Sequence, residues 1–137
     1  MTQIPKATKH LMIIDDNEID LYVSSMILER SSIDCKIVTK LSAMEAINYL
    51  NEISKETSQI PDLILLDINM PEMDGFGFLD VFGSMNDGIK NKTKIVMLTS
   101  SNDPGDIKRA GEYDYVKDYF LKPLNFESIQ NLSSVLA

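Results

Sequence analysis

The stretch that decides the fold reads DLILLDINMPEMDG and covers residues 62–75. Four consecutive apolar residues, Leu63–Leu66, are typical of a strand buried on both faces of a parallel sheet. An acidic residue, Asp67, follows this run directly, and a proline and an Asp-Gly pair then indicate a turn. The stretch therefore predicts a buried strand that ends in a carboxylate at one edge of a sheet.

The same pattern recurs along the chain, where short apolar runs alternate with amphipathic stretches. We expect strands at Leu11–Ile14, Lys36–Thr39, Leu63–Leu66, Ile95–Leu98 and Tyr119–Leu121, the second at a sheet edge because its run is mixed. We expect helices at Asn17–Arg30, Ser42–Ile53, Gly75–Met85, from Asp103-Pro104 to near Gly111, and Leu124–Leu136. This order predicts an α/β fold, a doubly wound five-stranded parallel sheet with its ligand site at the carboxyl ends of the strands.

Helical spacing also predicts which side chains face the core. The expected core-facing residues are Ile19, Val23, Met26 and Ile27 in the first helix, Met44, Ile47 and Leu50 in the second, Phe78, Leu79 and Phe82 in the third, and Phe126, Ile129, Leu132 and Leu136 in the last.

Length and composition limit the classes of function. The 137 residues suit one domain, which we place at 11–137 after an N-terminal extension, 1–10. The net charge of -8 disfavours binding to nucleic acid or to an anionic membrane. Because the N-terminus lacks the apolar stretch of a signal peptide and Cys35 is the sole cysteine, we expect a cytoplasmic protein that does not cross a membrane.

Candidate functional residues follow four of the five expected strands. Asp15-Asp16 follows the first, Asp67 the third, Thr99-Ser100 the fourth and Lys122-Pro123 the fifth. Taken singly, each has an ordinary explanation as a helix cap, a turn residue, a polar loop or a solvated charge. Taken together, three carboxylates at one sheet edge repel one another and require a cation among them.

Magnesium answers this requirement, because it prefers oxygen ligands and is often held by one or two carboxylates. Asp16 and Asp67 supply carboxylates, Asp15 binds directly or through water, and the backbone carbonyl of Asn69 completes the set. His10 stands alone before the first strand, and no His/Cys set for zinc is present in the sequence.

With the metal in place, Asp67 is a plausible nucleophile for phosphoryl transfer, since carboxylates form acyl phosphates. The transition state needs its equatorial oxygens neutralised. We assign one oxygen to Mg²⁺, a second to Lys122 and a third to the hydroxyl of Thr99.

From Leu11 to Leu136 the sequence resembles the receiver domain of two-component response regulators, of the single-domain chemotaxis-regulator type. The matching elements are Asp15-Asp16, Asp67-Ile68-Asn69-Met70-Pro71 with Asp74-Gly75, Thr99-Ser100 and Lys122-Pro123. The resemblance implies a flavodoxin-like fold with strand order 2-1-3-4-5, and phosphorylation of Asp67 by a histidine kinase or a histidine phosphotransfer protein. It also implies a cis peptide at Lys122-Pro123 and a switch pair formed by Thr99 and Tyr119.

Two segments depart from the family pattern. The connection Met85–Lys94 is longer than usual, and Gly111–Lys117 lacks a familiar Gly-Ala pair. Both concern the surface for a downstream partner, which the resemblance places on the fourth helix, fifth strand and fifth helix, around residues 106–126. Because the sequence ends after the last helix, we expect a stand-alone receiver without a DNA-binding domain. Whether it acts as a switch or relays the phosphoryl group stays open.

Three rival functions remain to be weighed. A phosphohydrolase of the haloacid dehalogenase type needs a second acid two residues after its nucleophile, and Asn69 stands there. A nucleotide-binding module needs a glycine-rich loop after the first strand, where Asp15-Asp16-Asn17-Glu18 is found instead. A receiver that binds partners without phosphorylation is disfavoured by the complete acidic set. We therefore expect a phosphoacceptor signalling domain that is not itself an enzyme, apart from self-phosphorylation from small donors and auto-dephosphorylation.

Overall fold

Five parallel strands form one sheet in the order β2-β1-β3-β4-β5, which confirms the predicted doubly wound topology. The computed structural model describes residues 8–137, so most of the predicted extension, 1–7, lies outside the described range. The strands are β1 (Lys9–Ile14), β2 (Cys35–Lys40), β3 (Leu63–Leu66), β4 (Lys94–Thr99) and β5 (Val116–Leu121). The mixed second strand lies at a sheet edge, as predicted, and β5 begins three residues before the predicted Tyr119.

Within residues 8–137, six helices connect and follow these strands, one more than predicted. They are α1 (Glu18–Glu29), α2 (Ala43–Ile53), α3 (Gly75–Gly83), α4 (Asp87–Lys92), α5 (Pro104–Gly111) and α6 (Phe126–Leu136). The unpredicted α4 occupies the long connection before β4, where the Asn86 side chain caps it and Ile89 is its one buried residue. The predicted caps of α2 and α5, Ser42 and Asp103, accept backbone N–H groups of their first turns.

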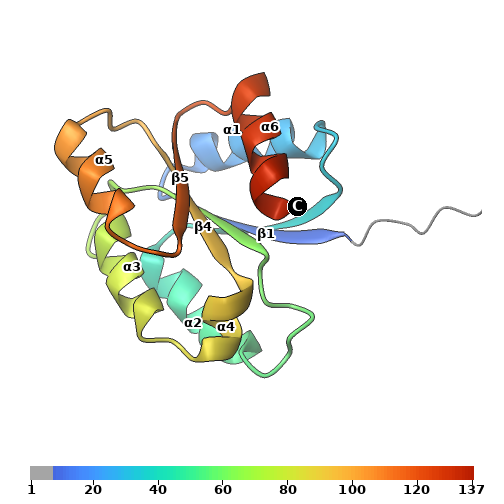
Figure 1. Cartoon of the computed structure of the whole chain (residues 1–137), viewed down its shortest axis with the longest axis vertical. Coiled ribbons are helices and arrows are strands. Elements are labelled where there is room, and N and C mark those ends of the chain that lie inside the picture. The colour runs from blue at the N-terminus through green and yellow to red at the C-terminus, as the bar shows by residue number, and fades with distance from the viewer. Residues whose placement is uncertain (1–7) are drawn as a thin grey trace, which may run out of the picture.

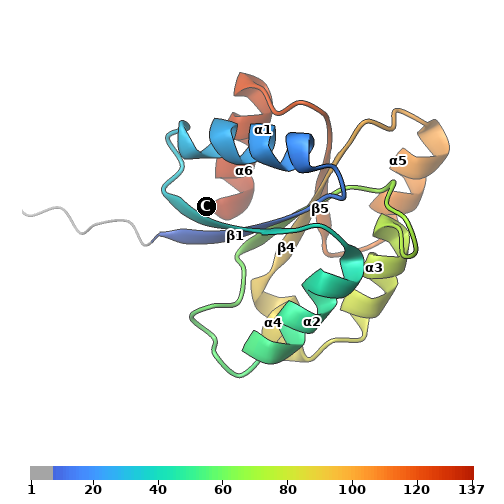
Figure 2. The same ribbon diagram turned by 180° about the vertical axis from the view of Figure 1, so that it is seen from behind.

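The helices cover both faces of the sheet. Helices α1 and α6 lie on one face, and α2, α3, α4 and α5 lie on the other (Figure 1). The view from behind shows the same three layers (Figure 2). Strand residues alternate between the two layers, so that Met12 and Ile14 pack with α2 and α3 while Leu11 and Ile13 pack with α1 and α6. Because both faces are covered, β3 is buried throughout, which explains its unbroken apolar run.

Three predictions of core-facing residues were wrong. In α1 the buried residues are Leu21, Ser24 and Leu28. Of the predicted stripe, Ile19 is 74% exposed, whereas Val23, Met26 and Ile27 are half-buried and Ile27 packs against the core. Met44 and Phe126 are also exposed, at 45% and 79%. The other predicted core residues of α2, α3 and α6 are buried. Within residues 8–137, no helix is both long and apolar enough to cross a membrane.

Candidate functional site

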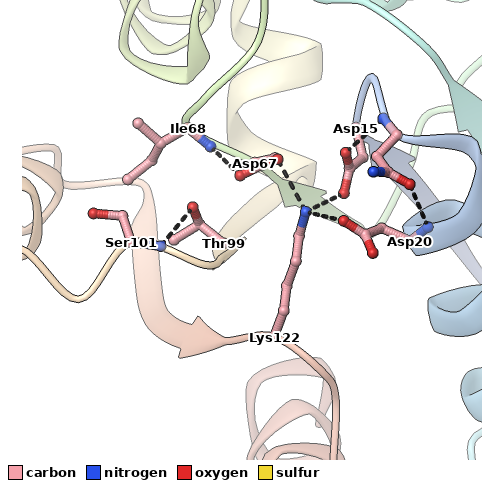
Figure 3. Close-up of polar contacts among 8 residues, drawn as sticks. Asp15, Asp20, Asp67, Ile68, Thr99, Ser101 and Lys122 are labelled. Carbon is pink, nitrogen blue, oxygen red and sulfur yellow. Dashed lines mark hydrogen bonds and ion pairs between the residues drawn. The ribbon is translucent and has the colours of Figure 1, made fainter.

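The carboxyl ends of four strands place the predicted polar residues at one edge of the sheet. Asp15 follows β1, Asp67 follows β3, Thr99 ends β4 and Lys122 follows β5. Backbone hydrogen bonds hold these ends together: the N–H of Asp67 donates to the carbonyl of Ile14 at 3.0 Å, and that of Lys122 to the carbonyl of Thr99 at 2.8 Å. Residues more than 100 positions apart therefore meet in one site (Figure 3).

The ammonium group of Lys122 lies at the centre of this site. Its Nζ is 2.6 Å from Asp15 Oδ2, 2.9 Å from Asp20 Oδ2 and 3.0 Å from Asp67 Oδ2 (Figure 3). The side chains of Asp15, Asp67 and Lys122 are only 4%, 7% and 13% exposed, so these ion pairs are shielded from solvent. The structure thus brings together three of the residues predicted from the sequence.

Asp20 is a site residue that the sequence analysis missed. It lies in the first turn of α1, where its N–H donates to the Asn17 side chain that caps the helix. Its carboxylate points back toward the sheet edge and reaches Lys122 (Figure 3). A signal was available, because an acid within one turn of a helix that starts beside Asp15 lies close to the same edge.

Three carboxylates form a group with the chemistry of a cation site. Oxygen atoms of Asp15, Asp16 and Asp67 all lie within 4.8 Å of one another. Asp15 and Asp67 are buried, and Asp16 is exposed, so the group opens to solvent on one side. An all-oxygen set with access to water fits Mg²⁺, which keeps several water ligands. The Lys122 ammonium already occupies part of this group as an internal cation.

One ammonium does not compensate the charge of its carboxylate partners. Burial raises the pKa of Asp15, helped by the nearby charge of Asp67, even though Lys122 and the N–H of Asn17 bond to the Asp15 carboxylate. Burial also works against the charge of Lys122, but hydrogen bonds to Asp15, Asp20 and Asp67 outweigh it and raise the pKa of Lys122. Because Lys122 is shared among several carboxylates, the site keeps a surplus of negative charge. A second cation would reduce the repulsion among these carboxylates.

The backbone fixes the position of Asp67. Its Oδ1 accepts the N–H of Ile68 at 2.8 Å, and its Oδ2 faces Lys122. Helix α3 starts against the same turn, where the N–H of Gly75 donates to the carbonyl of Ile68. A Cβ added at Gly75 would lie 2.4 Å from the backbone oxygen of Asp67, so only glycine permits this approach.

Thr99 and Tyr119 are linked through one loop. Thr99 is fully buried, and its Oγ1 accepts the N–H of Ser101 at 3.3 Å. The hydroxyl of Tyr119 donates to the carbonyl of Ser101 at 2.7 Å. Ser101 in turn donates its own hydroxyl to Asp106 of α5 at 2.6 Å. The loop after β4 is therefore in contact with both members of the predicted switch pair.

The remaining predicted features lie around this site. Asn69 is exposed in the loop after β3, and the role of its carbonyl as a metal ligand stays a prediction. The Lys122–Pro123 peptide is cis, as the resemblance implied.

The chain is similar to known proteins in both sequence and structure. A family model described as "Response regulator receiver domain" matches residues 11–133. Two-component response regulator ARR10 of Arabidopsis thaliana is 27% identical over 122 residues, which cover 89% of this chain but only 20% of ARR10. Response regulator Rcp1 of Synechocystis is 28% identical, and the match covers 92% of this chain and 87% of Rcp1. Hybrid signal transduction histidine kinase G of Dictyostelium discoideum is 28% identical over 88% of this chain and 3% of the kinase.

Solved structures give the same result. A two-component response regulator from Cytophaga hutchinsonii superposes with a TM-score of 0.87 at 31% identity, covering 95% of this chain and 98% of the other. The Mn²⁺-bound form of Rcp1 superposes with a TM-score of 0.70 at 26% identity, covering 90% and 88%. The phosphorylated cyanobacterial phytochrome response regulator RcpA gives 0.75 at 30% identity, covering 94% and 91%.

Proposed function

Because this chain belongs to the family of response regulator receiver domains, we propose that it accepts a phosphoryl group on Asp67 in a Mg²⁺-dependent reaction. The observation that carries the proposal is the contact between Lys122 Nζ and Asp67 Oδ2, 3.0 Å apart, beside a group of three carboxylates. That arrangement supports the proposal, because a carboxylate, an ammonium group and a set of oxygen atoms suited to a metal lie together at one edge of the sheet. The phosphorylated RcpA structure supports the same chemistry in a relative.

The metal is assigned to Asp15, Asp16 and Asp67, with the backbone carbonyl of Asn69 as a further ligand. The separation of at most 4.8 Å between the carboxylate oxygens supports this assignment. The Mn²⁺-bound form of Rcp1 supports it from a relative. When bound, Mg²⁺ supplies positive charge to the oxygens of the phosphoryl group.

The transfer itself is a displacement at phosphorus. An O–P bond forms to a carboxylate oxygen of Asp67 while the N–P bond of a donor phosphohistidine breaks, and its electron pair stays on the imidazole nitrogen. Lys122 holds its ammonium against one phosphoryl oxygen, and the Thr99 hydroxyl donates to another. No general acid is required of the chain when the other ring nitrogen of the phosphohistidine carries a proton, because the group that leaves is then a neutral imidazole.

We propose that Thr99 and Tyr119 convert phosphorylation into a change of surface. A new hydrogen bond from Thr99 to the phosphoryl group is worth about 1.5–3 kcal/mol, enough to shift a two-state loop by roughly ten- to a hundredfold. The loop in question follows β4 and contains Ser101. The carbonyl of Ser101 accepts a hydrogen bond from Tyr119, and its hydroxyl donates one to Asp106. The face of α5, β5 and α6 is then the surface that a downstream partner reads.

The partners that we propose are a histidine kinase or a histidine phosphotransfer protein as donor, in the cytoplasm. The match to a short segment of a hybrid signal transduction histidine kinase supports a donor of this class. The net charge of -8 argues against a direct role of these residues on nucleic acid. We place the domain at 11–137 and regard residues 1–10 as an extension to it.

Labelling with a small phosphodonor tests the proposal. The protein is incubated with acetyl phosphate and Mg²⁺, and intact mass spectrometry counts the phosphoryl groups. We expect one group, sensitive to hydroxylamine, which is lost with Asp67→Asn or excess EDTA. Asp80→Asn, which removes an exposed aspartate of α3 away from the strand ends, is the matched control and keeps its label. Equal labelling of Asp67→Asn would contradict the assignment of the acceptor.

A further inference from the structure

Asp20 differs from the other acids that contact Lys122. Asp15 and Asp67 belong to the group of three carboxylates that fits a metal, and Asp20 does not. Its Oδ2 lies 2.9 Å from Lys122 Nζ, and its side chain is 38% exposed. The cap of α1 holds the residue in place, since the Asp20 N–H donates to the side chain of Asn17 at 3.0 Å.

The Lys122 ammonium lies within 3.0 Å of three carboxylates, and two of these partners belong to the metal group. A divalent cation held by Asp15 and Asp67 competes with Lys122 for the same oxygens, and the two cations repel each other. Asp20 is then the one carboxylate partner of Lys122 that does not belong to the metal group.

There is also space into which the Lys122 ammonium can move away from Asp67. A pocket of about 160 Å³ lies beside it, lined by Asp20, Val23, Ser24, Lys122 and Pro123. A lysine side chain has a flexible four-carbon stem, so an unheld ammonium spreads over several positions. Loss of the Asp20 contact would let the charge drift from Asp67 toward this pocket and toward solvent.

We propose that Asp20 is a positioning residue that retains the Lys122 ammonium beside Asp67 when a cation binds to the three carboxylates. The inference rests on the proposed phosphoacceptor function of the same site. Asp20 itself touches neither the reacting oxygen nor the phosphoryl group, and it acts through Lys122.

The first test measures Lys122 directly, without any phosphodonor. Reaction of Lys122 with an amine-reactive reagent is followed by mass spectrometry in EDTA and in saturating Mg²⁺. We expect wild-type Lys122 to stay protected in both, and Lys122 of Asp20→Asn to react several-fold faster in Mg²⁺ only. Glu18→Gln removes the same charge from the same turn of α1, is exposed, and behaves as wild type. If Mg²⁺ exposes Lys122 equally in wild type and Asp20→Asn, the inference is wrong.

The second test measures the rate of Asp67 phosphorylation by acetyl phosphate at saturating Mg²⁺. We expect Asp20→Asn to lower this rate by about tenfold, since small errors in position are costly in transfer reactions. Asp20→Glu, which keeps the charge, should restore much of the rate. In a Lys122→Met background the Asp20→Asn change should have no further effect.

The two tests separate the inference from the function on which it rests. If wild type takes no label, the proposed function fails while the reactivity of Lys122 still decides the role of Asp20. If Asp20→Asn slows the wild type and the Lys122→Met protein by the same factor, Asp20 acts independently of Lys122 and the inference is overturned.

Discussion

Replacing Lys122 with methionine would leave two buried carboxylates, Asp15 and Asp67, without their cation. The lost contacts are 2.6 and 3.0 Å long, and both acids are more than nine-tenths buried. Removing one partner of a buried pair costs about 3–5 kcal/mol. We take the lower end, about 3 kcal/mol, because the site opens to water and the third contact, to the half-exposed Asp20, adds little. For a domain of this size the loss corresponds to a fall in Tm of about 10 °C.

The assay is urea unfolding followed by circular dichroism, with and without Mg²⁺. We expect Mg²⁺ to restore most of the lost stability of Lys122→Met, because it neutralises the same carboxylates. The pKa of Asp15 is already raised by burial, and loss of Lys122 raises it further. An acid whose pKa is higher in the folded than in the unfolded state stabilises the fold at low pH. This contribution is lost as the pH rises through the folded-state pKa. The deficit should therefore be smaller at acid pH, where Asp15 is protonated in the folded protein, than at higher pH, where it is ionised. If the loss of stability of Lys122→Met depends on neither Mg²⁺ nor pH, this electrostatic account is refuted.

Three further changes test separate parts of the site. Gly75→Ala should cost about 2–3 kcal/mol in denaturant unfolding, since its Cβ would lie 2.4 Å from the Asp67 oxygen; unchanged stability would show that α3 moves freely. Thr99→Ala should still be phosphorylated, but beryllofluoride, which mimics the phosphoryl group, should no longer shift the NMR signals of β5; undiminished shifts would remove this residue from the switch. Asp16→Ala should weaken Mg²⁺ binding in a thermal titration more than Asp15→Ala, and the opposite order would make the buried acid the inner ligand.

The strands and the strand-end residues could be predicted because local patterns determine them. A strand covered on both faces reads as an unbroken apolar run, and Leu63–Leu66 is fully buried as expected. In parallel strands the residue after each run reaches the same edge. Asp15, Asp67 and Lys122 could therefore be brought together from their positions alone.

Other features depend on packing that the pattern does not encode. Helix α1 carries apolar residues on more than one side, so helical spacing could not decide between the predicted stripe and the buried set that includes Ser24. Helix α4 has six residues and one buried side chain, Ile89, too few to show a period. The contact between Asp20 and Lys122 spans 102 positions and depends on where α1 begins relative to β5.

The most direct test of the central claim is to locate the phosphoryl group on the chain. Protein phosphorylated with Mg²⁺ and a phosphodonor is reduced with borohydride, which converts an aspartyl phosphate to homoserine, and is then digested and sequenced by mass spectrometry. The account predicts homoserine at position 67 and at no other aspartate, and no conversion when Mg²⁺ is withheld. Conversion at another aspartate, or none anywhere in protein that binds Mg²⁺, would contradict it.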